Sequence, residues 1–181
     1  LIKNKLRGYA SINAQTGEAL DTHSFATLIG VGATTVNPYL ALDSLYQRFE
    51  KKLFGKFGYD ECIERFIQSV NYGLLKIMSK MGISVLSSYR GGCNFETVGL
   101  SRTVASEYFP GVLSKISGIG LSGIENKLRT IHKQAFEDNN SVLPIGGLYR
   151  YRKNGETHQY QGKLMHLLQS SVGSNSFEGY K

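Results

Sequence analysis

The longest regular feature of this sequence is a stripe of apolar residues that begins after Asp60 and ends just before Gly82. Its members recur at spacings of three and four, which predicts an α-helix with one apolar face. They are Ile63, Phe66, Ile67, Val70, Leu74, Ile77 and Met81. Lys76 and Lys80 near the end, and Gly82 after it, are typical of a helix C-terminus. The stripe therefore predicts a long helix whose apolar face packs on a core.

A second helix is predicted from Asn37 onward. Asn37 is a favoured capping residue, and Pro38 suits the first helical position, where its missing N–H costs nothing. The apolar stripe of this helix consists of Leu42, Leu45, Tyr46, Phe49 and Leu53. Gly55 follows as an expected C-cap. We expect Leu42, Leu45, Phe49, Val70, Leu74 and Ile77 from the two helices to be core positions rather than site residues.

Strands are expected to be few and short. The sequence predicts them over residues 6–14, 25–29 and 83–86, with a hairpin near 149–160 around Asn154-Gly155, a dipeptide that favours type I′ turns. An intact doubly wound sheet would need more strands. The fold class is therefore α/β with partial domains, that is, short strands with amphipathic helices, and parts of two α/β units.

The remaining segments are predicted from their caps and breakers. A mostly helical segment with Ser101 as its cap and Pro110 as its stop precedes a Gly/Ser-rich loop over residues 114–121. Ser122 and Glu125 have the spacing of a capping box, so a helix should follow. We expect it to break at residues 138–140, and a last short helix to cover residues 164–172.

Composition excludes several classes of protein. Of 181 residues, 41% are hydrophobic and 19% are charged, which is unlike a disordered chain. No apolar run approaches the roughly 20 residues that cross a bilayer, and no signal peptide is visible. The sequence has no initiator Met and begins where a strand is already expected, so we expect it to be cut from a longer polypeptide.

The charge and the cysteines bear on partners and location. The net charge of +7 is consistent with a nucleic-acid surface, or with a basic face separated from an acidic partner. Cys62 and Cys93 are not in a CxxC motif, so zinc or redox spacing is absent. We therefore expect a reduced, cytoplasmic setting.

Two glycine-containing segments are candidates for anion binding. The backbone amides of Gly30-Val31-Gly32 could bind a phosphate before a helix. However, Thr35 stands where a dinucleotide-binding fingerprint needs its third glycine, so a tight turn between two elements also accounts for these glycines. Arg90-Gly91-Gly92 could grip an anion, or could be a loop in which glycine allows close packing. Both interpretations predict a turn rather than a regular element.

Single reactive side chains give weaker signals. The histidines, namely His23, His132, His158 and His166, have no HxxxH or HExxH spacing, and surface or structural roles account for them. Cys93 lies beside glycines, where thiols can be activated, but no neighbouring base is evident. Glu61 and Glu64 are expected to be solvated. Tyr149, Arg150, Tyr151, Arg152 and Tyr160 could stack bases on the predicted hairpin, or form a cross-strand ladder.

The order of several segments resembles one family. Thr16–Ala19, Thr22-His23 and Phe25–Ala41 resemble the end of the central domain of glutamate synthase. Gly73–Ser84, followed by Ser88–Gly91, resembles the segment that opens the synthase region of that family. Later landmarks occur in the family's order at Asn94–Leu100, Ser117–Gly120, His132 with Ala135-Phe136, and Gly155-Glu156 with His158.

The sequence departs from the family pattern at three places. His23-Ser24 replaces a common pair of histidines, Val31 replaces a common tyrosine, and Gly91–Glu96 replaces a common Gly-Ala-Gln-Ile-Phe-Glu block. Because of these departures, the resemblance assigns no specific role to His23 or Cys93. It assigns none to Arg90 either.

The resemblance implies an internal piece of the large (alpha) subunit of a flavoenzyme. Residues 1–68 would complete the central domain, and residues 69–181 would lead into the FMN domain, a β/α barrel. In the family, ammonia from glutamine is channelled to 2-oxoglutarate, and the imine is reduced at FMN. A 3Fe-4S cluster in the large subunit receives the electrons, which come from NADPH through a small (beta) subunit with FAD, or from NADH or ferredoxin.

The resemblance assigns no catalytic, cofactor-binding or metal-binding residue to these 181 residues. It implies that they space and scaffold reactive sites encoded elsewhere, with the rest of the large subunit and the small subunit as partners, and with neither nucleic acid nor membrane. The alternative, from another class, is a small basic module that binds RNA or another anion.

Overall fold

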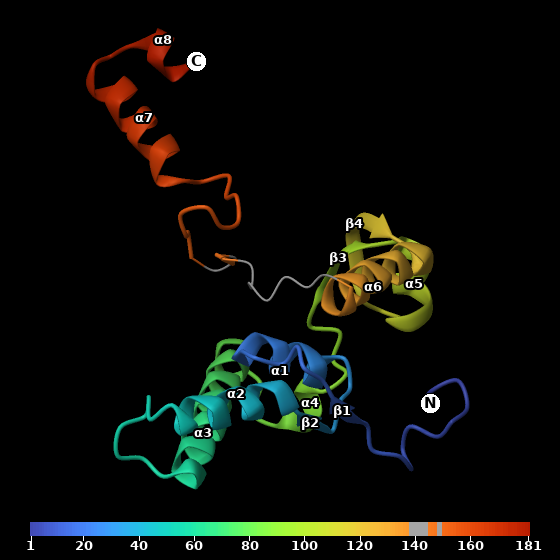
Figure 1. Cartoon of the computed structure of the whole chain (residues 1–181). Coiled ribbons are helices and arrows are strands. Elements are labelled where there is room, and N and C mark those ends of the chain that lie inside the picture. Colours follow the sequence, from blue (N-terminus) through green and yellow to red (C-terminus); the bar gives the residue numbers. More distant parts are fainter. Residues whose placement is uncertain (138–144, 148–149) are drawn as a thin grey trace. The chain divides into compact units, whose positions relative to one another are not determined.

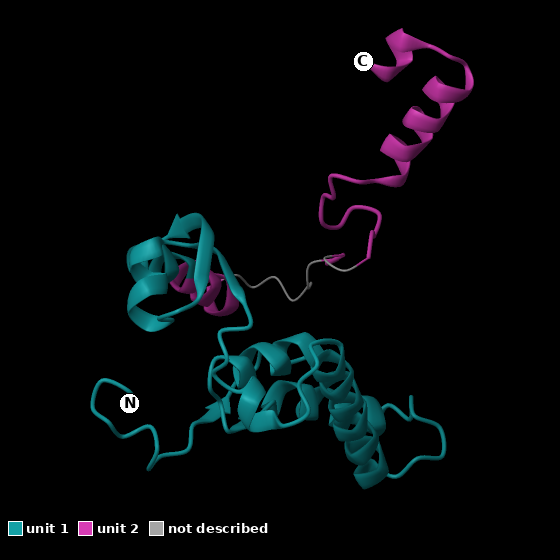
Figure 2. Ribbon diagram, turned by 180° about the vertical axis from the view of Figure 1, so that it is seen from behind, with its two compact units in different colours: residues 1–127 teal, residues 128–181 magenta. Residues whose placement is uncertain are grey.

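The computed structural model describes residues 1–137, 145–147 and 150–181 as a mixed α/β protein (Figure 1). It divides into two compact units, residues 1–127 and 128–181 (Figure 2). The described elements, in chain order, are β1 (Asn13–Gln15), α1 (Thr22–Gly30), β2 (Thr35–Asn37), α2 (Tyr39–Glu50), α3 (Tyr59–Lys80), α4 (Leu86–Tyr89), β3 (Glu96–Leu100), α5 (Arg102–Tyr108), β4 (Leu113–Ile119), α6 (Leu121–Phe136), α7 (Gly162–Gly173) and α8 (Phe177–Tyr180).

The first unit contains two small βαβ arrangements. β1 pairs in parallel with β2, from Asn13 opposite Thr35 to Gln15 opposite Asn37, and α1 connects the two strands. β3 pairs in parallel with β4, and α5 connects them. Parallel neighbours need such a crossover, because a tight turn cannot join them. The prediction of short strands in parts of two α/β units is therefore confirmed.

One predicted strand is a helix, and another is a loop that leads into a helix. The strand expected over residues 25–29 lies in α1, because the Asp21 carboxylate caps a helix by accepting from the Ser24 N–H at 2.8 Å. The strand expected over residues 83–86 is also wrong, since α4 begins at Leu86. Of the strand expected over residues 6–14, only the last two residues belong to β1.

The two helices predicted from apolar stripes are confirmed, but α2 ends at Glu50, so Leu53 lies beyond it and Lys51, not Gly55, is its C-cap. α2 begins at Tyr39, and Pro38 occupies the cap position, so Asn37 is not the cap but the last residue of β2. α3 is 22 residues long and ends at Lys80. Gly82 follows with a φ of 71°, in the left-handed region that favours glycine after a helix.

The loop predicted over residues 114–121 is wrong, because most of it forms β4. Its glycines permit close backbone approach rather than a turn: a Cβ on Gly118 would overlap the backbone of Gly99 in β3. The β3–β4 register shifts near this point. The predicted cap of the following segment is confirmed, since Ser101 Oγ accepts from the Val104 N–H at 3.2 Å.

The core of the first unit consists of two clusters on one side of α3. Phe25 and Val70 form the first with Ala19, and Tyr89 and Met78 form the second with Ala26. The Phe25 ring meets the Phe66 ring edge-on at 6.3 Å between centroids. Leu74 packs against both clusters, so it joins them into one apolar interior.

In the α6 region, the helix begins at Leu121, one residue before the predicted cap Ser122. In the second unit, α7 confirms the last predicted helix. The predicted hairpin is wrong, because the described residues 150–160 contain no strand. They contain a turn at Asn154-Gly155, where Gly155 N–H donates to Arg152 O at 3.0 Å and Asn154 has a φ of 63°. The break expected at residues 138–140 lies outside the described residues.

Within the described ranges, no helix has both the length and the apolar character needed to cross a membrane. The predicted domain boundary at residue 68 falls inside the continuous helix α3 and stays a prediction.

Candidate functional site

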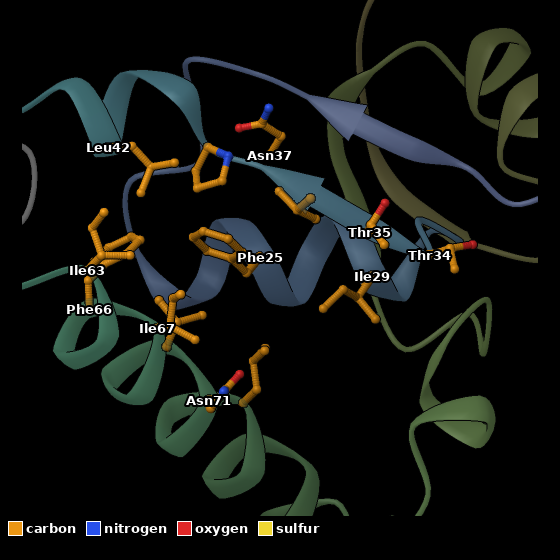
Figure 3. A pocket seen from close by; sticks show the side chains of 14 residues that line it. Phe25, Ile29, Thr34, Thr35, Asn37, Leu42, Ile63, Phe66, Ile67 and Asn71 are labelled. Carbon is orange, nitrogen blue, oxygen red and sulfur yellow. The ribbon is translucent and has the colours of Figure 1, made fainter. Parts of the chain in front are cut away.

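The first unit contains an apolar groove of about 460 Å³ between α1, β2 and α3 (Figure 3). Phe25 from α1 and Phe66 and Val70 from α3 form much of its wall, and Leu42 closes one end. The fourteen lining residues carry no titratable side chain, and their polar groups are threonine hydroxyls and asparagine amides. The groove therefore suits an apolar occupant and offers no acid or base.

The two glycine-containing candidates come together in the structure. Gly91 N–H donates to Gly30 O at 2.8 Å. A Cβ on Gly30 would overlap the ring of Phe95, which packs against the second core cluster. Both segments therefore take part in one packing contact between the end of α1 and the chain after α4.

Cys93 lies beside this contact. It lines a smaller hollow of about 140 Å³ together with Gly30, Gly91 and Phe95. Its thiol lies 3.7 Å from Pro110 O, its side chain is exposed, and its φ of 53° is unusual for a residue with a Cβ. No histidine or carboxylate is among the described residues that line the hollow, so none of them can activate the thiol as a base.

Substitution of Gly30 by alanine is expected to destabilise the first unit by roughly 1–3 kcal/mol, because the new methyl group would force the Phe95 ring out of its place. Phe95→Leu should relieve part of that clash, so the double variant should be more stable than the sum of the single changes predicts. Urea unfolding of the four proteins in this cycle measures the coupling. Strict additivity would contradict the contact.

The histidines hold separate structural positions. His23 is exposed in the first turn of α1. His132 lies against Phe136 with ring centroids 4.6 Å apart and the rings tilted by 37°, and His158 Nε2 lies 2.5 Å from Gly147 O. His166 is exposed on α7. Across the described part of the chain, no three His, Cys, Asp or Glu side chains are grouped to hold a metal ion.

The candidate carboxylates lie on the surface of α3. Glu61 forms an exposed ion pair with Arg65 at 2.9 Å, and the Arg65 guanidinium lies 4.2 Å from the centre of the Phe57 ring. Exposed pairs of this kind contribute about 0.2–1 kcal/mol. Glu64 is exposed beside them. Both carboxylates are thus on the solvated face.

The described aromatic and basic residues of the predicted hairpin near residues 149–160 do not lie on a hairpin. Arg150, Tyr151, Arg152 and Tyr160 are exposed, but no strand among the described residues aligns them, and Tyr149 lies outside the described residues. The RNA-binding alternative rested on that hairpin and on the net charge of +7, and of these two grounds only the charge remains.

Comparison with known proteins gives a consistent result. A family model described as "Glutamate synthase central domain" matches residues 1–101. The whole chain is 49% identical over 181 residues to "Glutamate synthase [NADPH] large chain" of Azospirillum brasilense, of which it covers 12%. It is 38% identical over 182 residues to the protein of the same name from Bacillus subtilis, again covering all of this chain and 12% of the relative.

A plant protein shows the same pattern. Over 190 residues, 99% of this chain is 39% identical to "Ferredoxin-dependent glutamate synthase 1, chloroplastic/mitochondrial" of Arabidopsis thaliana, and covers 12% of it. The chain therefore spans about an eighth of the length of these relatives.

Proposed function

The chain belongs to the glutamate synthase family, and from this premise we propose that it is a rigid spacer within an enzyme that makes glutamate from glutamine and 2-oxoglutarate. The observation that carries the proposal is the similarity of all 181 residues to the large chain of a glutamate synthase, of which they cover 12%. The work of this stretch is to keep an ammonia-producing site and a reducing site in fixed register.

The packing around α3 supports a rigid spacer. Twenty-two helical residues extend about 33 Å at 1.5 Å per residue. α1 packs along α3, and the two core clusters fix α1, α3 and α4 to one another. Close-packed interiors transmit displacement instead of absorbing it, so such a body can hold distant sites at a constant separation.

The cofactors of the reaction are proposed to bind outside this stretch. In the proposed enzyme, FMN and an iron–sulfur cluster would supply the reducing chemistry. Neither the two cysteines nor the lining of the apolar groove fits these groups. Cys62 is buried in α3 and Cys93 is exposed in a loop, whereas a cluster recruits three or four thiolates. The apolar groove has no Arg or Lys in its lining to bind a flavin phosphate.

The partners follow from the same premise. We propose that the central domain ends in this chain near residue 101, where the family-model match ends, and not at residue 68. We propose that the residues after it lead into an FMN domain, and that a small subunit with FAD and NADPH completes the enzyme. The relatives differ in reductant, since the bacterial names give NADPH and the plant name gives ferredoxin. The two cysteines are free, which fits a reducing cytoplasm.

A packing variant in the complete glutamate synthase tests the spacer role. Val70 is 7% exposed in the first core cluster, so Val70→Ala should loosen α3 against α1, at a cost of roughly 2 kcal/mol, without unfolding the protein. We expect the variant to release free ammonia while it hydrolyses glutamine, because the two sites lose register. The measurement compares ammonia released with glutamine consumed.

Tyr72→Ala is the matched control, because Tyr72 lies on the same helix but is 72% exposed. It should leave the enzyme tightly coupled. If Val70→Ala leaks no more ammonia than Tyr72→Ala, although its melting temperature has fallen, then this stretch does not maintain the register of the sites.

A further inference from the structure

The β1–β2 sheet has an open edge at β2. Within the described residues this sheet contains two strands. Thr35 N–H donates to Ile12 O at 3.2 Å, and Asn37 O accepts from Thr16 N–H at 3.1 Å, so Thr35 and Asn37 face β1. Backbone groups of successive residues in a strand point to opposite sides, so the N–H and C=O of Val36 point away from β1.

The apolar groove runs along this edge (Figure 3). Five consecutive residues, 34–38, line it. Successive side chains of a strand point to opposite faces of the sheet, so a cavity lined by every residue of a strand lies at its edge rather than over one face. Phe25, Ile29 and Ile67 form its apolar wall, and Ile67 is 49% exposed.

The open edge of a two-stranded parallel sheet is a site at which another strand can pair. Parallel sheets occur almost only where both faces are covered, and an isolated pair of strands is marginal in water. An open edge beside an apolar groove would also pair with other chains. The occupant therefore has to supply backbone hydrogen bonds and apolar side chains together, which is what an added β-strand supplies.

We propose that a further β-strand, supplied by the glutamate synthase polypeptide outside residues 1–181, pairs with β2 through Val36 and fills the groove. The inference rests on the proposed function in one respect, namely that this chain is part of a larger protein. The chain covers 12% of the Azospirillum brasilense relative, so most of such a polypeptide is available to supply the strand. The uncharged lining favours an apolar strand over a charged ligand.

Photo-crosslinking in the complete glutamate synthase identifies the occupant. A diazirine-bearing amino acid is placed at Ile67 in the groove and, as the control, at Tyr72 on an exposed position of the same helix. After irradiation and proteolysis, we expect position 67 to be joined to one apolar peptide from outside residues 1–181, with a yield well above that at position 72. A peptide from residues 138–181, a link between two copies of the chain, or no link above the control would overturn the proposal.

Proline at position 36 tests the hydrogen bond. Proline is tolerated at a true sheet edge but removes a bond within a sheet. We expect Val36→Pro to lower the melting temperature of the complete enzyme by several degrees more than Val36→Ala, which removes the side chain alone. Equal melting temperatures would mean that Val36 N–H has no strand partner. That result would leave the spacer role standing, because the spacer role is judged by ammonia release.

Discussion

Replacement of Leu74 by aspartate is expected to unfold the first unit. Leu74 packs against both core clusters of this unit, and it also lines the apolar groove. Leu74 is partly buried, so loss of the leucine would cost about 2–3 kcal/mol, the lower end of the range for core positions, and a carboxylate between the two clusters adds several more. The sum is comparable to the roughly 5–15 kcal/mol by which a whole domain is stable. Circular dichroism of the variant should show loss of helix at a temperature where the parent protein is folded.

The neighbouring residue provides the control. Leu75 lies on the same helix but is 60% exposed, so Leu75→Asp makes the same chemical change with the same effect on helix propensity and without burial. It should stay within about 0.5–1 kcal/mol of the parent. If the two variants melt together, α3 does not present the face that the structure assigns to it.

The helices with clear apolar stripes could be predicted from the sequence because their signal is local. In α2, α3 and α7, the spacing of apolar residues specifies both the helix and the face it buries. α1 was mistaken for a strand because residues 25–29 form a short apolar run, and such a run fits either element. The cap at Asp21, three residues before Ser24, was the signal that would have corrected the assignment.

The second sheet could not be predicted because its determinants are not local. Residues 114–120 are rich in glycine and serine, which favours a loop when each residue is considered alone. Gly118 is instead required by the backbone of Gly99, nineteen positions earlier in the chain. Pairing partners at such a distance leave no periodic trace in a single sequence.

The sequence predicted individual residues of the candidate site but not that they lie together. The sequence indicated Gly30, Gly91 and Cys93 one at a time, and the structure places all three around one hollow. The edge at Val36 was missed, although Thr34, Thr35 and Val36 are three consecutive β-branched residues and therefore a strand signal. The sequence predicts a helix start at Asn37-Pro38, directly after these residues, and that signal is stronger than the signal of so short a strand.

Tyr89→Ala is expected to be the most damaging truncation in the second core cluster. Tyr89 is 2% exposed, and its hydroxyl donates to Ala26 O at 3.3 Å across the interface of α4 and α1. Removal of a buried aromatic side chain costs about 3–5 kcal/mol. Tyr89→Phe keeps the ring and loses only the hydrogen bond, so it should cost about 1–2 kcal/mol. Urea midpoints of the three proteins separate packing from hydrogen bonding, and equal costs would place the ring outside the core.

The same phenol makes stability depend on pH. Burial raises the pKa of Tyr89 above its ordinary value of 10.0, so the folded protein holds the phenolic proton more firmly than the unfolded chain does. This contribution is fully present below the unfolded pKa and is lost as pH rises through the folded pKa. Tyr89→Phe cannot ionise, so its deficit relative to the parent should shrink as pH rises above about 10. Urea midpoints of both proteins across this range measure the change, and a constant deficit would show that the phenol ionises as freely in the folded protein as in the unfolded chain.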